Sequence, residues 1–127
     1  MNYILDTHTL IWFMEGNSFL SENARRAIED EENVKYISIA SLWEIAVKIS
    51  LGKLTLKKKF DSFLYDLSLT NIKILPVTIS HIIRVSTLEF FHRDPFDRLI
   101  ICQSLEENFN IIGRDQHFSR YNVGLYW

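Results

Sequence analysis

Short runs of strand-forming apolar residues, separated by longer stretches with helical spacing, constrain the fold of this chain most strongly. The runs are Tyr3–Leu5, Tyr36–Ile37, Ile72–Leu75 and Ile111–Ile112, and each is too short to be a helix. Each run is preceded or followed by a stretch in which apolar residues recur every three or four positions. Because strands that alternate with helices build parallel sheets covered by helices, we expect an α/β fold.

Three stretches place apolar residues on one face of a predicted helix, and together they can cover both sides of a sheet. The faces are formed by Leu42, Trp43, Ala46 and Ile49; by Phe60, Phe63, Leu64 and Leu67; and by Phe96, Leu99 and Ile100. Ser41 and Glu44 have the spacing of a capping box, and Gly52 suits the C-terminal stop of the same helix. Asp94 followed by Pro95 is typical of a helix N-terminus.

The composition is that of a globular chain that buries its own core. Of the 127 residues, 47% are hydrophobic, and glycine and proline are too rare to form a linker, so we expect a single domain over residues 1–127. The single Cys102 lies in an apolar run, which favours a buried thiol and a reducing, cytoplasmic setting. We expect neither a signal peptide nor a membrane span. The net charge of −2 means that any nucleic-acid contact must come from local basic patches.

Acidic residues follow two of the predicted strands. Asp6 comes directly after the first apolar run and Asp115 comes just after the last one, and the ligand crevice of an open parallel sheet lies at such strand ends. Glu44 lies opposite the apolar face of its predicted helix, and Asp97 lies in the first turn of another. Buried carboxylates that converge need a cation, and Mg²⁺ or Mn²⁺ prefers such oxygen ligands, so we expect a divalent-metal site.

Each of these acids also has a purely structural explanation. Glu44 can complete the capping box and pair with Lys48 one helical turn later. Asp97 can interact with the dipole of the helix that it opens, and Asp115 can cap the short segment that follows it. Asp6 can cap a helix that begins at the next residue, but its place after a short buried strand makes it the hardest of the four to explain in this way.

Four segments spread over the chain carry a resemblance to a known family. They are Leu5–Trp12, Ser41–Lys48 with Leu51–Leu54, His92–Leu99, and Arg114-Asp115 with Phe118. Taken together, they resemble the PIN-domain ribonucleases that serve as VapC toxins in bacterial VapBC toxin–antitoxin pairs. The resemblance implies a three-layer α/β/α sandwich with a mostly parallel central sheet. It also implies a Mg²⁺- or Mn²⁺-dependent endoribonuclease whose catalytic and metal-binding residues are Asp6, Glu44, Asp97 and Asp115.

The implied chemistry is metal-assisted hydrolysis of RNA that leaves a 5′-phosphate and a 3′-hydroxyl. We expect Asp6 and Asp97 to be the direct metal ligands, with Glu44 and Asp115 completing the site directly or through water. This chemistry requires no histidine pair, so the four histidines need no catalytic role. His8 and His92 stay ambiguous: His8 follows Asp6 closely and could form a hydrogen bond near the site, but a lone histidine is more often a structural residue. Gly113 stands where many relatives carry a small hydroxyl residue; the hydroxyl of Thr7 is a possible substitute.

Cations close in sequence to the acidic motifs are the candidates for contact with substrate phosphates. They are Lys48, Lys53, Arg93, Arg98 and Arg114, although several stand beside an acid that can neutralise them. The resemblance further implies three partners. These are RNA, a VapB-like antitoxin bound near the first helices, and a second copy of the chain in a homodimer.

Three other functions remain open at this stage. A phosphoacceptor receiver-type domain also places carboxylates and Mg²⁺ at the ends of parallel strands, but the lysine that it requires is not apparent. A noncatalytic PIN-like binding module is disfavoured by the complete set of four acids. A structure-selective DNA nuclease is disfavoured because the chain lacks insertions to hold a branched duplex.

Overall fold

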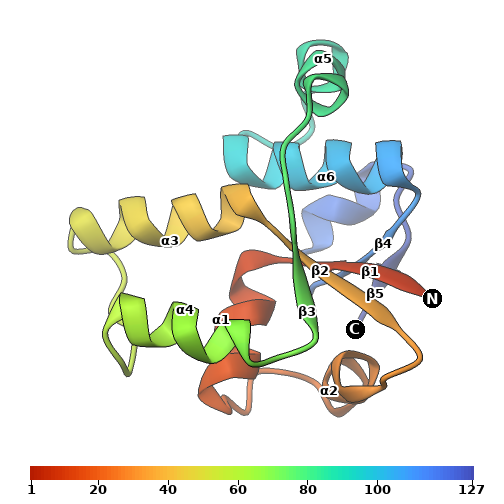
Figure 1. Ribbon diagram of the computed structural model, residues 1–127. Coiled ribbons are helices and arrows are strands. Elements are labelled where there is room, and N and C mark those ends of the chain that lie inside the picture. Colours follow the sequence, from red (N-terminus) through yellow and green to blue (C-terminus); the bar gives the residue numbers. More distant parts are fainter.

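The computed structural model describes all residues 1–127 and contains a five-stranded sheet surrounded by helices (Figure 1). The strands are β1 (Asn2–Leu5), β2 (Val34–Ser38), β3 (Ile72–Leu75), β4 (Asn110–Ile112) and β5 (Leu125–Tyr126). They lie in the order β3-β2-β1-β4-β5, and every neighbouring pair is parallel. The predicted α/β fold with a parallel sheet is confirmed, with β5 as an additional edge strand that the sequence patterns did not indicate.

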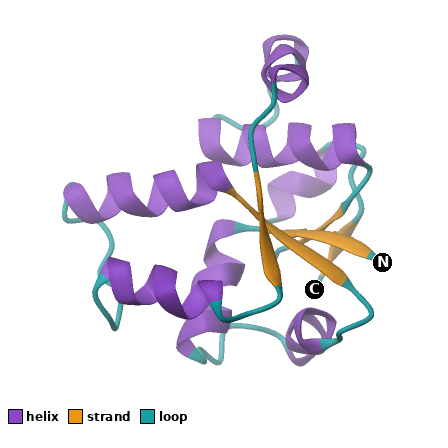
Figure 2. Ribbon diagram, viewed as in Figure 1, coloured by secondary structure: helices purple, strands orange, loops and turns teal.

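The helices form two groups on opposite sides of the strands (Figure 2). They are α1 (Thr7–Glu15), α2 (Glu22–Glu29), α3 (Ile39–Ser50), α4 (Phe60–Ser68), α5 (Ile79–Thr87) and α6 (Pro95–Glu107), with a short 3₁₀ helix η1 (Gln116–Arg120). None of these helices is both long enough and apolar enough to cross a membrane.

The core is divided by the sheet, because successive side chains of a strand point to opposite faces. In β1, Tyr3 and Leu5 belong to the larger core, which the sheet forms with α1 to α4. Ile4 belongs to a smaller core with residues of α6 and η1. Helices therefore pack on both faces of the sheet, and the predicted three-layer α/β/α sandwich is confirmed.

The helix ends agree with two of the predicted signals and contradict one. The Asp94 carboxylate accepts hydrogen bonds from the first turn of α6, with Pro95 at the first helical position. Gly52 adopts a left-handed conformation after α3, at φ 70°. The capping box predicted at Ser41 is wrong, because α3 begins earlier, at Ile39, and Ser38 is its N-cap.

Helix α5 lies outside the sandwich and packs mainly on the outer side of α6 (Figure 1). Its buried His81 is hydrogen-bonded to Glu107 of α6 at 3.0 Å, and Arg84 pairs with Glu106 at 3.1 Å. These contacts anchor α5 through polar groups, so that the isoleucines on its other face remain exposed. They are Ile79, Ile82 and Ile83.

Candidate metal centre

Asp6 and Asp115 lie beside each other because β1 and β4 are neighbours in the sheet. Leu5 of β1 pairs with Ile112 of β4, and the Asp6 N–H continues the ladder by donating to the Ile112 carbonyl at 3.0 Å. Asp6 occupies the N-cap position of α1, but its side chain makes no capping hydrogen bond. Helix capping therefore does not explain this buried carboxylate, which is only 6% exposed.

Asp97 joins these two carboxylates from the first turn of α6. It lies three residues after the Asp94 cap, and its backbone N–H donates to the Asp94 side chain at 3.0 Å. The carboxylates of Asp6, Asp97 and Asp115 line one cavity of about 190 Å³, which His8, Trp12 and Arg114 complete. Three of the four predicted acids thus meet in one small space at the carboxyl ends of the strands.

Glu44 is buried rather than on the exposed face that the helix pattern predicted. It is 2% exposed, whereas Trp43, which we placed on the apolar face, is 63% exposed. The physical reason is that α3 packs against both α1 and α6, so the side of the helix that carries Glu44 faces protein as well. Glu44 lines a second cavity of about 160 Å³, which shares His8 with the first.

Two polar side chains, those of Thr7 and Lys48, hold the buried Glu44 carboxylate, and Ser41 contacts Thr7. The Thr7 hydroxyl lies 2.7 Å from Glu44 Oε1 and 2.8 Å from the Ser41 hydroxyl. Lys48 forms an ion pair with Glu44 Oε2; burial works to lower the pKa of this lysine, but the hydrogen bond and charge of Glu44 outweigh burial and raise it. The hydroxyl of Thr7 is therefore used to orient Glu44.

Burial, together with neighbouring negative charge, raises the pKa of two site residues. Burial raises the pKa of Asp97 to about 8, with further contributions from the charges of Asp6 and Asp94. Burial also raises the pKa of Asp6 to about 6; His8 works in the opposite direction, and the charge of Glu44 adds to the rise. Both shifts show that these carboxylates lack a sufficient positive partner among the side chains.

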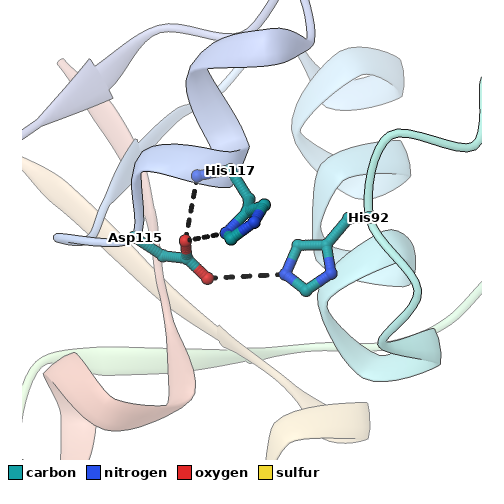
Figure 3. A group of neighbouring side chains, drawn as sticks. All are labelled: His92, Asp115 and His117. Atoms are coloured by element: carbon teal, nitrogen blue, oxygen red, sulfur yellow. Dashed lines mark hydrogen bonds and ion pairs between the residues drawn. The ribbon is translucent and has the colours of Figure 1, made fainter.

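Two histidines hold Asp115 in place, as Figure 3 shows. Asp115 Oδ1 accepts from the backbone N–H of His117 and lies 2.9 Å from its Nδ1. His92 Nε2 lies 3.4 Å from Asp115 Oδ2 and 3.0 Å from Asp97 Oδ2. Burial works to raise the pKa of Asp115, but the hydrogen bonds from His117 and His92 outweigh burial and lower it.

The backbone decides which nitrogen of His92 carries the proton. The Asp94 N–H donates to His92 Nδ1 at 3.2 Å, so Nδ1 is an acceptor and the neutral ring carries its proton on Nε2. This N–H points at Asp97 and Asp115. The ligand atoms of His92, Asp115 and His117 lie within 4.8 Å of one another, but His92 acts here as a donor that positions carboxylates. Sequence reasoning assigned no role to either histidine. His92 was ambiguous, within a segment that carries the family resemblance, and the only signal for His117 was its position two residues after a helix cap.

The cations predicted near the substrate have different surroundings. Arg93 and Arg114 are exposed and form no ion pair, whereas Lys48 is paired with Glu44. Arg98 is buried, and its guanidinium donates to the carbonyls of Glu89 and His92 and to two others. These bonds hold the loop that precedes α6, and Arg98 does not line the cavity of Asp6, Asp97 and Asp115.

The donor set fits a hard divalent cation. Only Glu44 of the four site carboxylates pairs with a lysine or arginine; the other three pair with histidines alone. The buried carboxylates of Asp6 and Asp97, with raised pKa values and too little positive charge, are the environment that Mg²⁺ or Mn²⁺ stabilises. Asp6, Asp97 and Asp115 are the residues positioned to hold such an ion, with Glu44 at the adjoining cavity.

The protein is an α/β protein with three carboxylates gathered at the carboxyl edge of its parallel sheet. The family model of the PIN domain matches residues 3–124. The chain therefore belongs to the PIN domain family, whose members are typically metal-dependent nucleases. A search of curated protein sequences found no match.

Solved structures with the same fold include toxin–antitoxin complexes. VapBC2 from Rickettsia felis, bound to a DNA fragment from its promoter, is similar at 21% identity and a TM-score of 0.72 over 99% of this chain and 98% of that chain. DNA-bound VapBC from Salmonella typhimurium is 14% identical, with a TM-score of 0.72 over 99% and 97%. VapBC-1 from nontypeable Haemophilus influenzae is 18% identical, with a TM-score of 0.70 over 99% and 97%. At these identities the likeness is one of fold.

Proposed function

We propose that this protein is a metal-dependent endoribonuclease that acts as the toxin of a type II toxin–antitoxin pair and is restrained by a VapB-like antitoxin. The observation that carries the nuclease proposal is the convergence of Asp6, Asp97 and Asp115 in one cavity, with the pKa of Asp97 raised to about 8. Helix capping does not explain why the Asp6 carboxylate is buried, because its side chain makes no capping hydrogen bond.

Asp6 and Asp97 would hold the cation, either Mg²⁺ or Mn²⁺, and Glu44 and Asp115 would complete the site directly or through water. The bound cation supplies charge neutralisation on the scissile phosphate and makes a water more acidic. The chain's own contribution is to fix the oxygens in advance. Lys48 orients Glu44. His92 positions the carboxylates of Asp97 and Asp115.

Substrate phosphates are bound by the exposed guanidinium groups of Arg93 and Arg114. Neither group forms an ion pair within the chain, so the full charge of each is available to a phosphate. Lys48 contributes through its remaining donors beside Glu44. RNA is the substrate that we favour over DNA, on the resemblance to toxin ribonucleases.

The proposed partners follow from the same resemblance. The solved VapBC complexes contain an antitoxin with the toxin, and we propose a VapB-like partner that covers the region near the first helices. We also propose a homodimer and a cytoplasmic location. Expression of the chain should arrest growth, and co-expression of the cognate antitoxin should relieve the arrest; toxicity that Asp6→Asn does not reduce would contradict the toxin proposal.

The nuclease proposal is tested by incubating the purified protein with a mixed pool of cellular RNA in Mg²⁺, in Mn²⁺ and in EDTA. Asp6→Asn and Asp97→Asn should each abolish the metal-dependent cleavage, while Asp61→Asn, which changes an exposed acid of α4, should not. Circular dichroism establishes that the variants fold. Cleavage that persists in EDTA and in both site variants would refute the proposed centre.

A further inference from the structure

Two aromatic rings and an arginine form a surface directly beside the carboxylates. Trp12 of α1 makes an edge contact with Phe19, with ring centroids 5.7 Å apart. Phe19 lies in the turn after α1, where its N–H donates to the Asn17 side chain at 2.9 Å, and it is 60% exposed. We call the side chains of Trp12, Phe19 and Arg114 the aromatic surface.

Arg114 places its guanidinium over both aromatic rings. Its guanidinium carbon lies 5.7 Å from the Trp12 ring centroid and 5.8 Å from that of Phe19, within the range of a cation–π contact. Although Arg114 is next to Asp115 in sequence, the two form no ion pair. The charge of Arg114 is thus held over aromatic faces and remains open to an anion from solvent.

The aromatic surface is continuous with the candidate metal centre. Trp12 and Arg114 line the same cavity of about 190 Å³ as Asp6, Asp97 and Asp115. A ligand that places a phosphate at the carboxylates therefore has its adjoining groups within reach of Trp12 and Phe19. An exposed phenylalanine by itself is ordinary, but here it stands beside a planar cation and an acidic cavity.

We propose that the aromatic surface is a nucleotide-binding subsite that takes an unpaired base of single-stranded RNA, with Arg114 on the neighbouring phosphate. This inference rests on the proposed nuclease function and identifies the form of its substrate. Stacking on aromatic rings binds unpaired bases with little sequence preference, and an arginine plane adds both stacking and charge. An apolar peptide segment would gain from the rings but would leave the charge of Arg114 without a partner.

The experiment measures the binding of a fluorescein-labelled, random-sequence single-stranded RNA of about 12 nucleotides by fluorescence anisotropy. All proteins carry Asp97→Asn, which prevents cleavage during the measurement. Phe19→Leu keeps an apolar side chain but removes the π face, and Arg114→Lys keeps the charge but removes the plane. Phe90→Leu is the matched control, because Phe90 is 70% exposed and also lies under a guanidinium, that of Arg98, but outside this cavity.

Phe19→Leu should weaken RNA binding by about tenfold, as expected for the loss of one stacked base, and Arg114→Lys should weaken it by a smaller factor, because lysine keeps the charge at the phosphate but loses the guanidinium plane. Phe90→Leu should bind like the parent, and an abasic oligonucleotide of the same length should not distinguish Phe19→Leu from the parent. Unchanged RNA binding by Phe19→Leu would overturn the subsite. An equal loss for the abasic strand would also overturn it, since stacking on a base would then not be involved.

Two further outcomes separate this inference from the proposed function. If the wild-type protein cleaves RNA with metal while Phe19→Leu binds RNA normally, the subsite fails and the nuclease stands. If Phe19→Leu keeps its RNA affinity but loses affinity for the antitoxin, the aromatic surface is a protein-binding site and the inference is refuted. If the wild-type protein neither cleaves nor binds RNA, both proposals fall.

Discussion

Neutralising Asp97 should stabilise the metal-free protein at alkaline pH. The folded-state pKa of Asp97 is raised from 3.8 to about 8, first by burial and then by neighbouring carboxylates. At pH values between 3.8 and about 8, Asp97 keeps its proton in the folded protein, whereas the same side chain has lost it in the unfolded chain. The free energy of unfolding therefore falls as pH rises from about 4 to about 8, and this contribution stays lost at higher pH.

The size of the effect follows from the same pKa. Since one pKa unit corresponds to about 1.4 kcal/mol, the rise to about 8 sets an upper limit of about 6 kcal/mol on the cost of ionised Asp97. Salt and side-chain relaxation screen part of the repulsion, so we expect about 3 kcal/mol. Asp97→Asn should be more stable than the wild type by that amount at pH 9 and by only about 1.6 kcal/mol at pH 5, because pH 5 lies little more than one unit above the unfolded-state pKa of 3.8.

Urea denaturation in EDTA at both pH values measures this difference. Glu31→Gln, at an exposed position with no ion pair, is the control for general loss of one negative charge. Adding Mg²⁺ at pH 9 should stabilise the wild type and reduce the advantage of Asp97→Asn, because the cation binds the folded state only. If Asp97→Asn shows no gain at pH 9, or the same gain at both pH values, the charge crowding inferred from the cavity is wrong.

Three further changes test the groups around the centre. Thr7→Val should lower kcat/KM about tenfold by leaving Glu44 without its hydroxyl donor, and Thr7→Ser should restore the rate; equal activity of Val and Ser variants would contradict this role. His92→Phe should weaken Mn²⁺ affinity about tenfold in calorimetry, because Asp97 and Asp115 lose a positioning donor; unaltered Mn²⁺ affinity would argue against this role of His92. Arg98→Met should lower the free energy of unfolding by about 3 kcal/mol, since buried carbonyls lose their donors, and a loss under 1 kcal/mol in urea denaturation would not fit.

Much of the fold was accessible from local patterns. The four predicted strands, the helices at Phe60 and Pro95 and the acidic cap at Asp94 depend on short-range rules of periodicity and capping. Asp6 could be singled out because a carboxylate directly after a buried strand has few structural uses. β5 was missed because its two residues carry no periodicity.

The errors concern residues that pack against more than one element. Glu44 and Arg98 both looked like surface residues beside an opposite charge, and both are buried. A helical pattern identifies the face turned to the sheet, but it contains no information about a second helix packed alongside. The burial of Glu44 results from the contacts of α3 with α1 and α6.

The sequence by itself determined the alternation of strands and helices and the placement of acids at strand ends, because these depend on residues close together in the chain. Only the tertiary structure decided which side chains surround those acids. His92 reaches Asp115 across 23 residues of sequence, and Arg114 meets Trp12 from the far end of the chain. Such contacts depend on how the loops and helices pack in three dimensions, which no local pattern encodes.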